Sequence, residues 1–201
     1  MELNQKFQDF SKLIKENVPV NLIVIIACAV MFAAEKSMGR LIFGPDGKFG
    51  FYSWDIWSNE QSQRLIDPYS LSHITHGLLF YAILWLLLPK VPIKYRFMIA
   101  VGIEAIWEIM ENSSFIINRY RAVTVSLGYF GDSIINSISD LFMMIIGFVL
   151  ASKSRVWISI AFVITLEIIM LIWVKDNLSL NIIMLLFPIE AIKNWQMAGH
   201  V

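Results

Sequence analysis

Long apolar runs alternate with short polar segments along most of the chain. Five of these runs are long enough to cross a bilayer, and they lie near residues 18–34, 70–89, 97–117, 132–152 and 156–174. A helix needs about 20 predominantly apolar residues to span the hydrocarbon core of a membrane. The pattern therefore predicts an all-α fold, a polytopic transmembrane bundle of about five spans within a single integral membrane domain covering residues 1–201.

A further apolar stretch near the C-terminus differs from these five. It covers residues 178–192 and is interrupted by Pro188. A run of about 15 residues is more typical of a re-entrant or interfacial helix than of a full span. The sequence leaves open whether this stretch spans the membrane, re-enters it or lies on its surface.

Composition supports a membrane protein and excludes several other classes. The chain is 57% hydrophobic and only 16% charged, whereas soluble domains are about 25% charged. No basic stretch indicates nucleic-acid binding. The single cysteine, Cys28, excludes a disulfide framework within the chain. The lipid bilayer is therefore the expected partner, and the oligomeric state stays open.

The basic residues predict an orientation. The N-terminal tail, the 90–96 turn and the 153–155 turn are all basic, and five spans place them on the same side. Because short cytoplasmic loops are enriched in Lys and Arg, we expect a cytoplasmic N-terminus and a periplasmic C-terminus in a bacterial inner membrane. The first apolar run also resembles a signal peptide, but no clean small-residue cleavage site follows it, which favours an uncleaved span.

Three of the predicted spans carry polar or ionisable side chains in helical register. The sets are His73 and His76 in the span 70–89, Glu104, Glu108 and Glu111 in the span 97–117, and Asp132, Asn136 and Asp140 in the span 132–152. These spacings place the members of each set on one side of their helix. Because ionisable groups are costly in lipid, they usually face the interior of a bundle or a wet cavity. The predicted topology puts all three sets in the outer half of the membrane, which predicts a polar cleft open to the periplasm.

Two imidazoles and several carboxylates in one cleft suggest metal or acid/base chemistry. The candidate catalytic residues are His76, Glu108, Glu111, Asp132 and Asp140. The candidate metal ligands are His73, His76, Glu108 and Glu111, a set that suits a divalent ion such as zinc, iron or manganese. The same groups can supply a general acid and a general base without a metal. The structural alternative is that the histidines anchor the interface, while Glu104 and Asn136 form hydrogen bonds between helices.

A basic segment follows the third predicted span. Arg119 and Arg121 lie just outside it, and a guanidinium can bind an anionic head group through two hydrogen bonds. We therefore consider Arg119, Arg121, Asn112 and Asn136 as substrate-binding candidates. The alternatives for the two arginines are ion pairs with the acidic cleft or contact with lipid head groups.

Four stretches carry a resemblance to a known family. They are "DPYSLSHITHGLLFY", "IEAIWEIMENSSFIINRYRA", "YFGDSIINSISDLFMMIIGF" and "VKDNLSLNIIMLLFPIEAIKNWQ". From about Trp54 to Gln196 the chain resembles a family of uncharacterised bacterial inner-membrane proteins grouped under a domain of unknown function. That resemblance implies a polytopic topology and no established activity. A weaker, pattern-level similarity to VanZ-like membrane proteins would imply a role in the cell envelope.

Three classes of function fit the sequence. The first is a membrane enzyme, metal-dependent or acid/base, that acts on a lipid or lipid-linked envelope substrate at the periplasmic face. The second is a proton- or ion-coupled carrier, which the carboxylates favour but which the lack of an inverted repeat disfavours. The third is a non-catalytic membrane subunit or assembly factor whose polar stripes bind a partner.

Overall fold

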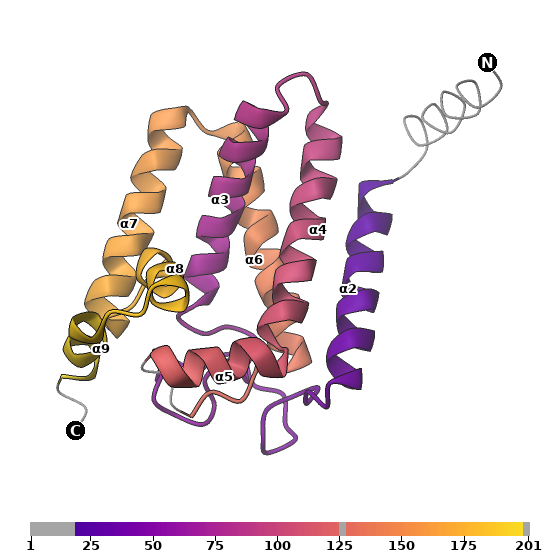
Figure 1. Cartoon of the computed structure of the whole chain (residues 1–201). Coiled ribbons are helices and arrows are strands. Elements are labelled where there is room, and N and C mark those ends of the chain that lie inside the picture. The colour runs from indigo at the N-terminus through magenta and orange to yellow at the C-terminus, as the bar shows by residue number, and fades with distance from the viewer. Residues whose placement is uncertain (1–18, 125–127, 199–201) are drawn as a thin grey trace.

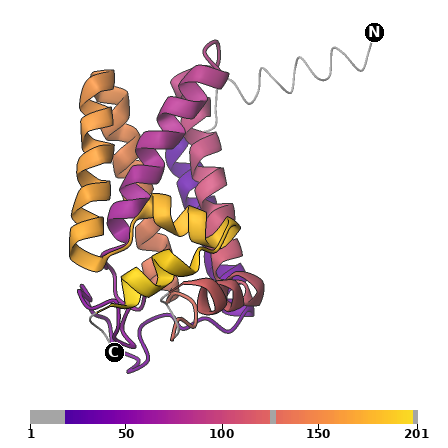
Figure 2. The same cartoon turned by 60° about the vertical axis from the view of Figure 1, so that its left-hand side comes forward.

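The computed structural model describes residues 19–124 and 128–198, and this part of the chain forms a helical bundle. Its long helices are α2 (Val20–Ser37), α3 (Ser70–Leu87), α4 (Ile93–Glu111), α6 (Ile134–Lys153) and α7 (Val156–Val174). Its short helices are α5 (Ser114–Val123), α8 (Leu178–Leu186) and α9 (Glu190–Met197). The long helices run roughly alongside one another, and the short ones gather toward one end (Figures 1 and 2). The predicted all-α bundle is confirmed.

Four of the described helices, α2, α3, α6 and α7, are long and apolar enough to cross a membrane. Helix α4 is equally long, at 19 residues, but it carries three glutamates and a basic first turn. It ends at Glu111, whereas the sequence predicted a continuous span to residue 117. The Ser113 side chain accepts a hydrogen bond from the Ile116 backbone N–H and thereby starts α5. An N-cap serine has extended backbone angles, so the chain turns at this point.

The apolar C-terminal stretch forms two short helices rather than one. Helix α8 ends at Leu186 and α9 begins at Glu190, with Pro188 between them. Proline lacks a backbone N–H and its ring clashes with the preceding helical turn, which explains the break. Helix α8 lies beside the lower halves of α3 and α7 in both views (Figures 1 and 2).

The loops divide between the two ends of the bundle as the sequence predicted. The start of α2, the α3–α4 turn and the α6–α7 turn lie at the upper end of Figure 1. The loop 38–69, helix α5 and the C-terminal helices lie at the lower end. The lysines of the N-terminal tail, on which the orientation partly rests, lie outside the described residues. The side of the membrane on which each end lies stays a prediction.

Helices α3 and α6 form the centre of the bundle, and their backbones touch. A Cβ atom added at Gly77 would lie 2.0 Å from the Met144 carbonyl oxygen, and one added at Gly147 would lie 2.0 Å from the Ile74 carbonyl oxygen. Small residues at helix crossings permit this close approach. The crossing fixes the first turns of α3, which carry the histidines, against the middle of α6.

An apolar core fills the upper half of the bundle. Its buried members come from α2, α3, α4 and α6, and they include Met31, Leu84, Val101, Met144 and Phe148. The polar side chains of these same helices lie closer to the lower end. The bundle therefore has an apolar half and a polar half, and the candidate site belongs to the polar half.

Candidate functional site

Two histidines of α3 contact one glutamate of α4. His73 Nδ1 lies 2.7 Å from Glu104 Oε1, and His76 Nδ1 lies 3.1 Å from both carboxylate oxygens of the same residue. Glu104 is completely buried, with an exposed fraction of 0%. A buried carboxylate is strongly destabilising unless it is paired, so the two imidazoles account for its position in the bundle.

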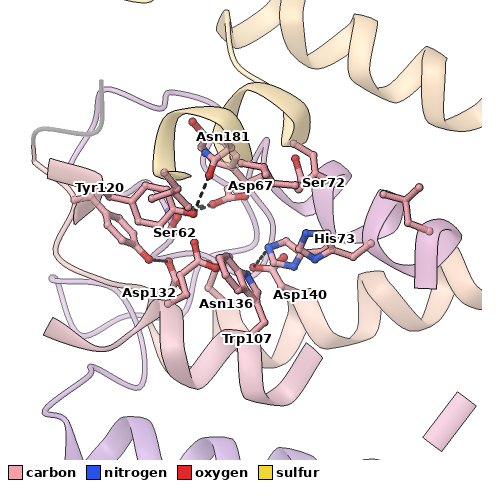
Figure 3. A pocket seen from close by; sticks show the side chains of 18 of the residues that line it. Ser62, Asp67, Ser72, His73, Trp107, Tyr120, Asp132, Asn136, Asp140 and Asn181 are labelled. Carbon is pink, nitrogen blue, oxygen red and sulfur yellow. Dashed lines mark hydrogen bonds and ion pairs between the residues drawn. The ribbon is translucent and has the colours of Figure 1, made fainter. Parts of the chain in front are cut away.

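His73 also contacts a second carboxylate of α4 and one of α6. Its Nδ1 lies 3.3 Å from Glu108 Oε1, and its Nε2 lies 3.8 Å from Asp140 Oδ2 on α6. The Ser70 hydroxyl donates to the other oxygen of Asp140 at 3.0 Å. Figure 3 shows His73 and Asp140 side by side in the pocket. One imidazole therefore connects α3 with both α4 and α6.

Two groups of side chains bring together enough ligand atoms to hold a metal ion. In the first, His73, His76 and Glu104 each offer one ligand atom, and these atoms lie within 4.8 Å of one another. In the second, His73, Glu108 and Glu111 meet the same condition. Glu108 has an exposed fraction of 0%, and neither of its oxygens has a hydrogen-bond partner among the described residues. Buried carboxylate oxygens normally have partners, so Glu108 is a candidate to bind a cation or a proton.

Asp132 is held in a separate network below the histidines. It accepts hydrogen bonds from Asn112 Nδ2 at 3.0 Å and from the Tyr129 hydroxyl at 2.9 Å. Its own backbone N–H donates to Asn112 Oδ1 at 2.7 Å. Asn136 Nδ2 donates to the Arg64 carbonyl oxygen at 2.9 Å. The two asparagines thus fasten loops to the ends of α4 and α6, and their predicted role in substrate binding stays untested.

A cavity of about 400 Å³ gives access to this cluster. Its polar lining includes His73, His76, Glu111, Asp132 and Asp140 (Figure 3). Its apolar lining consists of Leu79, Phe80 and Ile83 of α3, Ile103 and Trp107 of α4, and Leu178, Ile182 and Leu185 of α8. The remaining lining residues are polar or aromatic: Gln61, Ser62, Asp67, Tyr69, Ser72, Tyr120, Tyr129, Asn136 and Asn181. The described lining residues include neither Lys nor Arg. The cavity is thus acidic at one end and apolar at the other.

Asp67 extends the acidic lining on the loop before α3. It accepts hydrogen bonds from the Ser62 N–H and hydroxyl, both at 3.1 Å, and from the Ser70 N–H at 3.1 Å. Burial raises the pKa of the Asp67 carboxyl, and the bonds from Ser62 oppose that shift. Asp67 was not among the predicted site residues, although an acid just before an apolar run commonly stabilises the start of a helix.

The structure brings together all the candidate catalytic and metal-binding residues within one polar region. His73, His76, Glu111, Asp132 and Asp140 line the cavity, and Glu108 lies directly behind His73. Glu104 was interpreted as a hydrogen-bonding residue between helices. It does form such bonds, but its partners are the two candidate ligands, so it belongs to the site. Its i, i+4, i+7 spacing with Glu108 and Glu111 was the feature of the sequence that could have placed it in the site.

The two arginines of α5 bond to the backbone of residues that line the cavity. Arg119 donates from Nε and Nη2 to the Leu185 carbonyl oxygen at 3.0 and 2.9 Å. Arg121 Nε donates to the Tyr129 carbonyl oxygen. Neither arginine lines the cavity. Their contacts hold α8 and the segment before α6 in place, and their predicted contact with an anionic head group stays a prediction.

Comparison with known proteins identifies relatives without an assigned activity. Over 152 residues the chain is 48% identical to a UPF0314 protein of Paracoccus denitrificans, covering 76% of this chain and 79% of the relative. It is 42% identical to one from Sphingopyxis alaskensis, covering 90% and 94% of the two chains, and 46% identical to one from Brucella anthropi, covering 87% and 89%. The similarity to VanZ-like proteins is not shown by these comparisons. No solved structure matches.

The family assignment rests on most of the chain. The family model described as "Protein of unknown function (DUF2585)" matches residues 36–198, which include all the candidate site residues. This range agrees with the resemblance noted from about Trp54 to Gln196. The chain belongs to the DUF2585 family.

Proposed function

We propose that this protein is an inner-membrane metalloenzyme that acts on a lipid or lipid-linked substrate of the cell envelope by hydrolysis or group transfer. The site would lie toward the periplasmic face, as the distribution of basic residues predicts. One observation carries the proposal: two imidazoles and three carboxylates converge beside the acidic end of a cavity whose wall along α3, α4 and α8 is largely apolar.

The ligand set fits a divalent ion better than it fits ordinary helix packing. Imidazole nitrogen and carboxylate oxygen are the donors that zinc, iron and manganese share in proteins. The first ligands would be His73, His76 and Glu104. Asp140, 3.8 Å from the free ring nitrogen of His73, lies where carboxylates orient a metal-bound imidazole.

Such an ion would supply both the nucleophile and charge stabilisation. A bound divalent metal lowers the pKa of its water and polarises a carbonyl or phosphoryl oxygen of the substrate. Hydrolysis would join the water oxygen to the carbonyl carbon or the phosphorus as the bond to the ester oxygen breaks, and the proton taken from the water would pass to that leaving oxygen. Glu108, whose oxygens have no hydrogen-bond partner among the described residues, would accept the proton of the water.

Metal analysis of protein purified without chelators tests this proposal. We expect the wild-type protein to bind zinc, iron or manganese stoichiometrically, and the His76→Ala variant to lose most of it. The exposed Glu190→Gln on α9 is the matched control and should keep the metal. A wild-type protein that stays metal-free after incubation with each of these ions would contradict the metalloenzyme.

A proton-coupled carrier is the second candidate, and one observation favours it. Glu35 of α2 is fully buried, and Ser137 and Asp132 lie near its carboxyl group. A second cavity of about 230 Å³ on this side of the bundle is lined by Arg40, Gln63 and Asp132, and Asp132 lines both cavities. Proton flux into vesicles that collapses in Asp132→Asn and Asp140→Asn would support the carrier, and unchanged flux would count against it.

A further inference from the structure

Several residues that line the cavity are also exposed on the flank of the bundle. The exposed fractions are 48% for Ile83 of α3 and 40% for Ile103 of α4, and Leu79 and Ile182 are exposed as well. His73 and Asp140, at the acidic end, are only 7% and 3% exposed. The cavity therefore runs from a buried acidic end to an open apolar mouth between α3, α4 and α8.

The position of this mouth along the helices places it against lipid. Helix α3 is long and apolar enough to cross a membrane. Ile83 is the 14th residue of α3, which is about 20 Å from the start of the helix at a rise of 1.5 Å per residue. Residues this far along a spanning helix face acyl chains rather than water. An opening at this depth admits molecules from the bilayer.

We infer that the ligand of this site is a membrane phospholipid that enters sideways between α3 and α4. Its acyl chain would lie along Leu79, Ile83 and Ile103, and its head group would reach His76 and Glu111. The identity of the ligand as a substrate rests on the proposed function, whereas the route rests on the shape and lining of the cavity alone. Apolar walls with a few polar groups at one end are typical of sites that bind such molecules.

The charge of the lining restricts the head group. Asp67, Glu111, Asp132 and Asp140 all line the cavity, and the described lining offers no Lys or Arg. A phosphate would therefore find no cationic side chain in the described lining to pair with. In a phospholipid with an amine-bearing head group, a divalent ion would bind the phosphate and the amine would face the carboxylates. We therefore expect a phospholipid with an amine-bearing head group.

Photo-cross-linking tests the route in the full-length protein. The protein is reconstituted into vesicles that contain a small fraction of phosphatidylethanolamine with a diazirine in its acyl chain, and adducts are mapped by mass spectrometry. We expect adducts at Leu79, Ile83 and Ile103 well above those at Ile164, which is more exposed than any of them but lies on α7 and does not line the cavity. Equal labelling of these two surfaces would overturn the inference.

A variant that fills the mouth separates this inference from the proposed function. Ile83→Trp should lower labelling at Ile103 several-fold and leave metal binding unchanged, whereas Ile164→Trp should alter neither. Bound metal without preferential labelling of the mouth would overturn lateral entry and leave the metal site intact. Preferential labelling without bound metal would overturn the metal site and leave lateral entry intact.

The head group is tested separately. The same cross-linking with phosphatidylglycerol should give fewer adducts at the mouth, and equal yields would contradict the amine-bearing head group.

Discussion

Glu104 is held in place by both histidines of the cluster and is completely buried. It contacts both histidines at 2.7 to 3.1 Å and has no access to solvent. A carboxylate in such a position orients both rings, because each Nδ1 faces one of its oxygens. If an ion binds there, the same position makes Glu104 the carboxylate ligand beside the two imidazole ligands.

Replacement of Glu104 by Gln keeps the shape of the side chain and removes its charge. We expect zinc affinity to fall at least about tenfold, since even residues that only support metal ligands cost 10–100-fold when mutated. Competition with a chromophoric chelator measures the affinity. Glu190→Gln, at the exposed start of α9, is the control. Equal zinc affinities in wild type and Glu104→Gln would show that this carboxylate is not a ligand.

Asp176 gives a prediction about pH. It follows α7 and accepts hydrogen bonds from the Tyr69 hydroxyl at 3.0 Å and from Gln196 Nε2 at 3.0 Å. Burial raises its pKa from 3.8 to about 6, and the hydrogen bond from Tyr69 opposes the shift. Because the folded state holds this proton more tightly than the unfolded state, the stability that the proton gives is complete below about pH 4. It is lost as the pH rises to about 6.

The Asp176→Asn variant removes this titration and isolates its effect. Two pKa units correspond to about 3 kcal/mol, so wild type should lose up to about this much stability relative to the variant between pH 4 and pH 7. Unfolding in detergent at a series of pH values measures the difference. Exposed Asp55→Asn serves as a control for the loss of a carboxylate. Parallel stability curves for wild type and Asp176→Asn would contradict the prediction.

At the scale of elements, the crossing of α3 and α6 determines the position of the histidines. An alanine at Gly147 would place its Cβ 2.0 Å from the Ile74 carbonyl oxygen, which is too close for the backbones to stay in place. We expect Gly147→Ala to destabilise the protein by about 1–3 kcal/mol, the usual cost of overpacking, and to weaken metal binding. Thermal unfolding in detergent and metal content measure both effects. Gly102→Ala on α4, where an added Cβ meets no atom within 4 Å, should change neither.

The polar stripes could be predicted from the sequence because their register is a local property of each helix. His73, Glu108 and Asp140 share a region of the bundle since each lies on the inward side of its own helix. The partners of Arg119 could not be predicted in the same way. It donates to the carbonyl oxygen of Leu185, 66 residues further along, and that contact depends on how α8 folds back. The end of α4 could have been predicted, because Ser113 is a typical N-cap residue for a new helix. The apolar residues on both sides of it favoured one continuous span instead.

At the scale of the whole molecule, the bundle has an apolar half at one end of its long axis and a polar half at the other. The core around Met144 and Phe148 lies toward the turns that carry Lys90 and Lys153. The carboxylates lie toward the longer loops and the C-terminal helices. Since short basic turns favour the cytoplasm, we expect the polar half to be the periplasmic half. The site would then meet envelope lipids from the outer leaflet.

Cysteine labelling in intact cells tests this orientation. Cys28 is the single cysteine and is half-buried, so a Cys28→Ser background accepts one new cysteine at a time. A membrane-impermeant maleimide should label Asn118→Cys, on the exposed side of α5 at the lower end of the bundle, without cell lysis. It should label Ser154→Cys, in the α6–α7 turn at the other end, only after lysis. The opposite pattern would place the polar half in the cytoplasm, and the lipid ligand would then have to come from the inner leaflet.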